Sequence, residues 1–147
     1  MTPAALLVGS ANASVGFAAG MAILRDGGSA IDAVCAVVAI VEANPDDHSV
    51  GFGGLPNLLG QVELDASLMD GRTLAAGSVG ALRTHQDAIL LARRVMEELP
   101  HVLIVADGAT RLAREFGLSE VDLLTPESER VWRTRLADGG RDLAYLQ

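Results

Sequence analysis

Apolar and polar residues alternate along residues 62–69, and this alternation predicts the clearest strand of the chain. The even positions from 62 to 68 carry Val, Leu, Ala and Leu, whereas the odd positions begin with Glu, Asp and Ser. A period of two buries one face of a strand and leaves the other polar. Asp70-Gly71 follows and predicts a hairpin turn. We therefore expect residues 73–82 to return as a second strand, which Gly77 and Gly80 weaken.

Two segments before this hairpin have the apolar spacing of helices. Residues 14–25 end before Gly27-Gly28, which predicts a left-handed cap at the helix C-terminus. Residues 29–43 begin at Ser29, an N-cap residue with Asp32 three positions later, close to a capping box. This second helix is apolar nearly all round, so we expect other elements to bury it.

The second half of the chain predicts alternating helices and strands. Residues 86–99 form an amphipathic helix that Pro100 ends. Short continuous apolar runs at residues 4–8 and 102–106 predict strands, of which the second is expected to be buried on both faces of a layered sheet. Two further helices are expected, at residues 107–117, with Asp107 as its cap, and at residues 125–136.

A glycine-rich loop joins the second helix to the first strand. Pro45 ends the helix, and Gly51, Gly53 and Gly54 permit positive φ and close backbone approach. A loop of this kind next to a half-buried strand is a common position for a functional site. It lacks the Gly-Lys-Ser/Thr of a phosphate-binding loop and the dinucleotide fingerprint, so no cofactor is predicted.

Composition indicates one domain with a core of small aliphatic residues. The chain has 147 residues, of which 50% are hydrophobic and only 3% aromatic. A net charge of −8 argues against nucleic acid or an anionic membrane as partner. The longest apolar run, residues 33–41, is too short to span a bilayer, and no leader pattern precedes it, which predicts a cytoplasmic protein. The single cysteine, Cys35, lies in this run and is expected to be buried.

Few side chains suggest chemistry by themselves. His48 lies beside two aspartates, but no second His or Cys has metal-ligand spacing, so no metal is predicted. Asp65 and Asp70 are interpreted as solvated or turn-capping carboxylates rather than as an acid/base pair. Ser49 lies next to the loop glycines, but no histidine base with an orienting carboxylate accompanies it, so it is not interpreted as a nucleophile.

Five blocks of sequence, in unbroken order between residues 6 and 132, resemble the α-chain of glycosylasparaginase. This family of N-terminal-nucleophile hydrolases also holds the plant-type asparaginases and isoaspartyl peptidases. The blocks are Gly27-Gly-Ser-Ala-Ile-Asp-Ala-Val34, Asp47-His-Ser-Val-Gly-Phe-Gly-Gly54, Glu63-Leu-Asp-Ala-Ser-Leu-Met-Asp-Gly71, Gly77-Ser-Val-Gly80 and Pro100-His-Val-Leu-Ile-Val105.

The resemblance implies an α+β layered fold, with this chain as half of a four-layer αββα sandwich. Residues 1–137 would form the α-chain of the domain, and residues 138–147 a linker or tail toward the cleavage site. The family's precursor cleaves itself before a threonine, which becomes the nucleophile at the start of a separate β-chain. The implied function is hydrolysis of the side-chain amide of asparagine, or of a β-aspartyl or N4-substituted derivative, by a dimer of αβ units without a cofactor.

The resemblance assigns supporting roles, but no catalytic nucleophile, to this chain. Ser49 would form a hydrogen bond near the threonine, with Gly51 and Gly53 supporting the loop, and Ser10, Ala11 and Asn12 would form a wall beside the substrate. Glycosylasparaginases carry tryptophan where this chain has Ala11, so free asparagine and β-aspartyl peptides stay open beside glycan-linked asparagine. The alternative is a non-catalytic, truncated α/β scaffold or binding module, which would leave apolar strands uncovered.

Overall fold

The computed structural model describes residues 5–137, except for the side chain of Ala11. Residues 138–147, predicted to be a linker or tail, lie outside the described residues. In chain order the elements are the 3-10 helix η1 (Ala11–Gly16), α1 (Phe17–Arg25), α2 (Ala30–Glu42), β1 (Leu64–Met69), β2 (Ala76–Leu82), α3 (Ala88–Glu98), β3 (Leu103–Val105), α4 (Ala106–Glu115) and α5 (Pro126–Ala137).

The predicted hairpin is confirmed as β1 and β2, which pair antiparallel, and β3 adds to β2 in parallel. The turn between them runs over residues 70–75. The Asp70 carboxylate accepts hydrogen bonds from the Arg72 N–H at 2.8 Å and the Thr73 hydroxyl at 3.0 Å. Asp70 is thus a turn-capping residue, as interpreted from the sequence.

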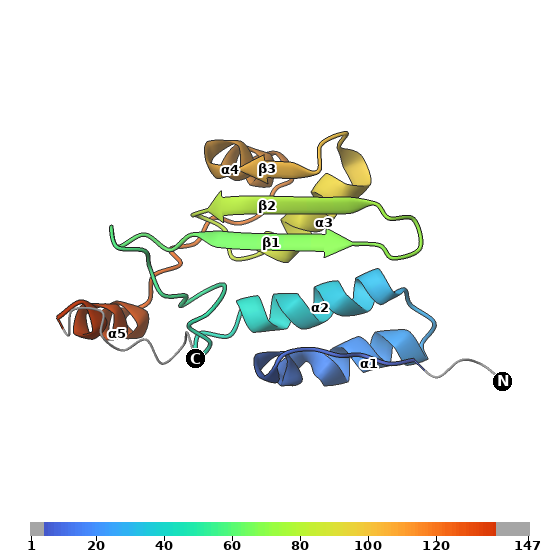
Figure 1. Ribbon diagram of the computed structural model, residues 1–147, viewed down its shortest axis with the longest axis horizontal. Helices are drawn as coiled ribbons and strands as arrows, with labels where there is room; N and C mark the ends of the chain where they lie inside the picture. The colour runs from blue at the N-terminus through green and yellow to red at the C-terminus, as the bar shows by residue number, and fades with distance from the viewer. Residues whose placement is uncertain (1–4, 138–147) are drawn as a thin grey trace.

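Helix α3 packs across β1 and β2 and supplies the centre of the core (Figure 1). Its predicted amphipathic character is confirmed, because Ala88, Ala92 and Val95 are buried on one face together with Leu91, which has no exposed surface. Close approach of helix and strand depends on Gly77, where an added Cβ would lie 2.3 Å from the Ala92 carbonyl oxygen. The buried apolar residues of this cluster are Val62, Leu64, Val79, Leu82, Ala88, Leu91, Ala92, Val95, Ala109, Ala113 and Leu123.

The predicted end of the first helix and the predicted start of the second are confirmed, whereas residues 14–16 of the first belong to the 3-10 helix η1. Ser29 and Asp32 form the complete capping box, and the Ser29 hydroxyl accepts from the Asp32 N–H at 3.0 Å. Gly27 has φ +85°, and the Gly28 N–H donates to the Ile23 carbonyl at 2.8 Å. This pair of glycines ends α1 in a Schellman-type cap.

The expectation that α2 is buried on every side is wrong. Ala33, Cys35 and Val37 are buried, which confirms a buried cysteine, but Val34 and Ile40 are exposed. The 3-10 helix η1 and the helices α1 and α3 each contact α2, but within residues 5–137 no element covers Val34 and Ile40. An apolar helix is buried only where a neighbour packs against it.

The two short apolar runs also differ from their predictions. Residues 5–10 form no strand, and Leu6 and Val8 are 82% and 81% exposed, because the segment has no strand beside it and lies near α1. Strand β3 exists but is not buried on both faces, since Leu103 and Val105 are 57% and 52% exposed. Helix α4 begins directly after β3 at Ala106 without a side-chain cap, so Asp107 lies in its first turn and is not the cap.

Helices α3 and α4 cover one face of the sheet, and the described chain leaves the opposite face uncovered (Figure 1). That open face presents mainly polar side chains from β1 and β2, with Met69 at the end of β1, and apolar side chains from β3. The described part is therefore a small α+β domain with one helical layer packed on its sheet. No helix within residues 5–137 is both long and apolar enough to cross a membrane.

Candidate functional site

The loop after α2 is folded tightly against the end of that helix. Gly51 has φ +63°, and an added Cβ would lie 2.0 Å from the Glu42 carbonyl oxygen, which accepts the Phe52 N–H at 2.7 Å. Gly53 has φ +86°, and its N–H donates to the Leu123 carbonyl at 2.8 Å. The predicted need for positive φ and close approach at these two glycines is confirmed.

Ser49, the predicted supporting residue, is held by the carboxylate of Asp47. Asp47 Oδ1 accepts hydrogen bonds from the Ser49 backbone N–H at 2.9 Å and from the Ser49 hydroxyl at 2.5 Å. Asp47 is 8% exposed, and its Oδ2 has no hydrogen-bond partner within residues 5–137. The bond from the Ser49 backbone N–H to the side chain two positions earlier forms an Asx-turn, which aspartate in a loop favours, so this signal was available in the sequence.

His48 also serves the loop. Its Nδ1 lies 2.8 Å from the Gly53 carbonyl oxygen. Because a carbonyl only accepts, Nδ1 carries the proton of this hydrogen bond. No group of three or more His, Cys, Asp or Glu side chains within residues 5–137 is arranged to hold a metal.

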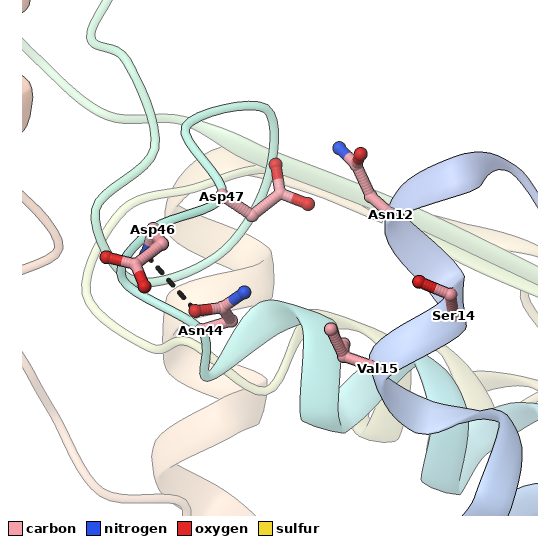
Figure 2. Close-up of a pocket in the computed structure, with 6 residues that line it drawn as sticks. All are labelled: Asn12, Ser14, Val15, Asn44, Asp46 and Asp47. Carbon is pink, nitrogen blue, oxygen red and sulfur yellow. Dashed lines mark hydrogen bonds between the residues drawn. The ribbon is translucent and has the colours of Figure 1, made fainter.

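A cavity of about 270 Å³ lies between η1 and this loop. Figure 2 shows its six lining residues. They are Asn12, Ser14 and Val15 from η1, and Asn44, Asp46 and Asp47 from the loop. Two segments that the sequence analysis assigned separately, the substrate-side wall and the loop of Ser49, therefore meet at one cavity.

The wall itself is only partly at this cavity. Asn12 lines it, whereas Ser10 is the exposed N-cap of η1, and the side chain of Ala11 lies outside the described structure. Ser49 does not line the cavity either but is bonded to Asp47, which does. Asp47 is the residue that joins the two predicted segments, and sequence reasoning considered it only as a metal-site neighbour.

Glu42, at the end of α2 where the loop begins, is the second polar residue that the sequence analysis missed. It is 4% exposed, its Oε1 accepts the Ile89 N–H of α3 at 3.0 Å, and its Oε2 has no partner among the described residues. Burial raises the pKa of Glu42 to about 8, against the opposing effect of the Ile89 N–H. The neutral acid thus ties α2 and the loop to the first turn of α3. In the sequence, the only indication of this role was a single carboxylate directly after the apolar run of residues 33–41.

The other titratable candidates have structural roles. Asp65 accepts the Ala81 N–H at 2.8 Å, and Asp70 caps the turn beyond the other end of β1, so the two do not form an acid/base pair. His85 has no exposed surface, and burial lowers its pKa, which favours the neutral ring. Its Nδ1 lies 2.8 Å from the Thr84 hydroxyl oxygen, so His85 is a buried, hydrogen-bonded residue of the loop between β2 and α3.

The sequence profile of the asparaginase family matches residues 10–144. The chain belongs to the asparaginase family. It is 44% identical over 120 residues to an isoaspartyl peptidase/L-asparaginase of Danio rerio, covering 80% of this chain and 38% of that protein. It is also 44% identical over 111 residues to an N(4)-(Beta-N-acetylglucosaminyl)-L-asparaginase of Elizabethkingia miricola, covering 76% and 32%.

A Mus musculus protein named N(4)-(beta-N-acetylglucosaminyl)-L-asparaginase is 44% identical over 115 residues, covering 76% of this chain and 33% of its own length. The asparaginase-family chain thus spans about a third of the curated relatives it matches. Relatives with two different activity names are equally similar to it, so identity does not select between them.

Proposed function

We propose that this chain is the α-subunit of an amidohydrolase that cleaves the side-chain amide of asparagine or of a β-aspartyl or N4-substituted asparagine. The observation that carries the proposal is the family match together with the cavity at which Asn12 meets the loop of Ser49. The nucleophile is the N-terminal threonine of a β-chain from the same precursor. Its hydroxyl attacks the amide carbon, its own α-amine takes the proton, and water hydrolyses the resulting acyl-enzyme after the amine leaves.

Ser49 supports this threonine by a hydrogen bond. A hydroxyl that already donates to Asp47 keeps its oxygen lone pairs available to accept from a neighbouring hydroxyl or ammonium group. Gly51 and Gly53 hold the loop at the end of α2, so the position of Ser49 is defined by the backbone as well. Its function is therefore positioning, and the catalytic groups belong to the β-chain.

The open face of the sheet is where the β-chain packs in this proposal. Met69, Leu103 and Val105 are each more than half exposed on that side. Apolar surface of this extent favours a covering layer. A second sheet laid on it gives the four-layer αββα sandwich, with residues 1–137 as the α-chain, residues 138–147 as the link toward the cleavage site, and two αβ units as the particle.

The test is to express the full precursor and to measure the intact masses of the denatured product, with N-terminal sequencing of any second chain. The proposal expects two chains, the second beginning with threonine, and release of an amine from at least one of L-asparagine, a β-aspartyl peptide and N4-glycosylated asparagine. A single unprocessed chain without amidase activity contradicts the proposal and favours the scaffold alternative.

A further inference from the structure

The cavity between η1 and the loop after α2 has an unusual charge. Of its six lining residues, two are aspartates, three carry neutral polar side chains, and none is basic. Within residues 5–137 no arginine or histidine forms a salt bridge with Asp46 or Asp47. The cavity therefore presents two uncompensated negative charges.

One of these carboxylates is oriented for a ligand. Asp47 is 8% exposed, its Oδ1 is occupied by Ser49, and its buried Oδ2 has no partner among the described residues. Figure 2 shows the Asp47 carboxylate directed toward the space between the loop and η1, which the Asn12 amide and the Ser14 hydroxyl also face. A buried carboxylate oxygen without a donor is costly, so it favours a ligand that brings a hydroxyl, an amide N–H or an ammonium group.

The cavity is large enough for such a group. Its volume of about 270 Å³ is several times the ~30 Å³ of a water molecule in the liquid. A ligand carboxylate would meet Asp46 and Asp47 at close range and would be repelled. The site thus accepts donor-rich, uncharged or cationic groups and discriminates against anionic ones.

Of the two halves of a substrate, the leaving group fits this chemistry. The aspartyl half is common to all the amides in the proposed function and always carries its own carboxylate. The leaving amine differs among them: ammonia and an amino sugar have no carboxylate, whereas the amino acid released from a β-aspartyl dipeptide has one. We infer that this cavity receives the leaving group of the amide and that Asp46 and Asp47 select against leaving groups bearing a carboxylate. The inference rests on the proposed amidohydrolase function.

The experiment compares two substrates of the processed full-length enzyme that differ in one charge, β-aspartyl-alanine and β-aspartyl-alaninamide. The quantity measured is the ratio of kcat/KM for the alaninamide to that for the alanine substrate. Asp46→Asn removes one cavity charge at an exposed position, and Asp26→Asn removes an exposed charge at the opposite end of the α1–α2 pair as a matched control (Figure 1). For each variant, this ratio of kcat/KM values is divided by the ratio of the natural enzyme. The division cancels the intrinsic difference in reactivity between alanine and alaninamide as leaving amines.

We expect Asp46→Asn to lower this ratio roughly threefold to fivefold at low ionic strength, chiefly by faster cleavage of the alanine substrate, and Asp26→Asn to leave it unchanged. Added salt should also lower this ratio for the natural enzyme, because it screens the repulsion between the cavity carboxylates and the carboxylate of the alanine substrate. An unchanged ratio in Asp46→Asn, with both substrates cleaved, refutes the inference and leaves the proposed function standing. An equal decrease in kcat/KM for both substrates also refutes the inference. The cavity would then bind the ammonium group of the aspartyl half, which the two substrates share. If the enzyme cleaves neither β-aspartyl substrate, nor L-asparagine, nor N4-glycosylated asparagine, that result refutes both the proposed function and the inference.

Discussion

Replacing Glu42 by glutamine should abolish a pH dependence of stability that this one carboxyl confers. Glutamine has the same shape, keeps an oxygen that accepts the Ile89 N–H, and does not titrate. The folded state raises the pKa of Glu42 from 4.5 to about 8, so it binds a proton that the unfolded chain has lost. The contribution of this proton to the free energy of unfolding is fully present below pH 4.5, the pKa in the unfolded chain. It decreases as the pH rises and is lost above about 8, the pKa in the folded protein.

The magnitude follows from the shift. One pKa unit corresponds to about 1.4 kcal/mol, so between pH 5 and pH 8 the natural protein should lose roughly 3–4 kcal/mol relative to the Glu42→Gln variant. Urea unfolding of both proteins at pH 5, 6, 7 and 8 measures this difference as a growing separation of the two midpoints, by about 1–3 M at the upper end.

The matched control is Glu97→Gln, which changes an exposed carboxylate on α3 and should alter the free energy of unfolding by only a few tenths of a kcal/mol, as expected for a surface pair. If the free-energy difference between the natural protein and Glu42→Gln stays constant within about 0.5 kcal/mol from pH 5 to pH 8, the carboxyl is not held neutral by burial. The account of how the loop is tied to α3 would then be wrong.

Three further predictions concern the site and the core. Ser49→Ala should lower the unfolding free energy by about 1–2 kcal/mol without unfolding the domain, because the buried Asp47 carboxylate loses a donor, and it should slow either precursor cleavage or amide hydrolysis roughly tenfold. Full activity would remove Ser49 from the site. Gly51→Ala should lower the free energy of unfolding in urea by about 2–4 kcal/mol, because Gly51 has a positive φ and lies against the Glu42 backbone. The control Gly71→Ala, at a position with open space around it, should lower it by less than ~1 kcal/mol. Equal losses in the two variants would contradict the loop geometry. Leu91→Ala should lower the unfolding free energy by about 2–5 kcal/mol, and the exposed Leu58→Ala should change it by less than ~0.5 kcal/mol.

The site was predictable from the sequence only in its backbone. The glycines at 51 and 53 indicated a tight loop, and Ser49 was assigned through the resemblance to a known family. Nothing local to residues 10–12 or 44–47 indicates that these segments meet at one cavity, because α1 and α2 separate them along the chain. The buried states of Asp47 and Glu42 are equally non-local, since their burial comes from elements distant in sequence.

What the sequence by itself determined were features made by hydrogen bonds over a few residues. The Ser29–Asp32 capping box, the Gly27-Gly28 cap and the turn capped by Asp70 each form within six positions of the chain. The amphipathic helix α3 belongs with them, because its period already defines its buried face.

Only the tertiary structure decided which apolar segments are covered. Residues 5–8, β3 and most of α2 are apolar, and this hydrophobicity predicted a strand at the first and burial of the other two. The first has no strand beside it, the second lies at the sheet edge with an open face, and the third is covered by η1, α1 and α3 on part of its surface. Hydrophobicity favours burial, but whether a neighbour lies within contact distance is a property of the whole fold.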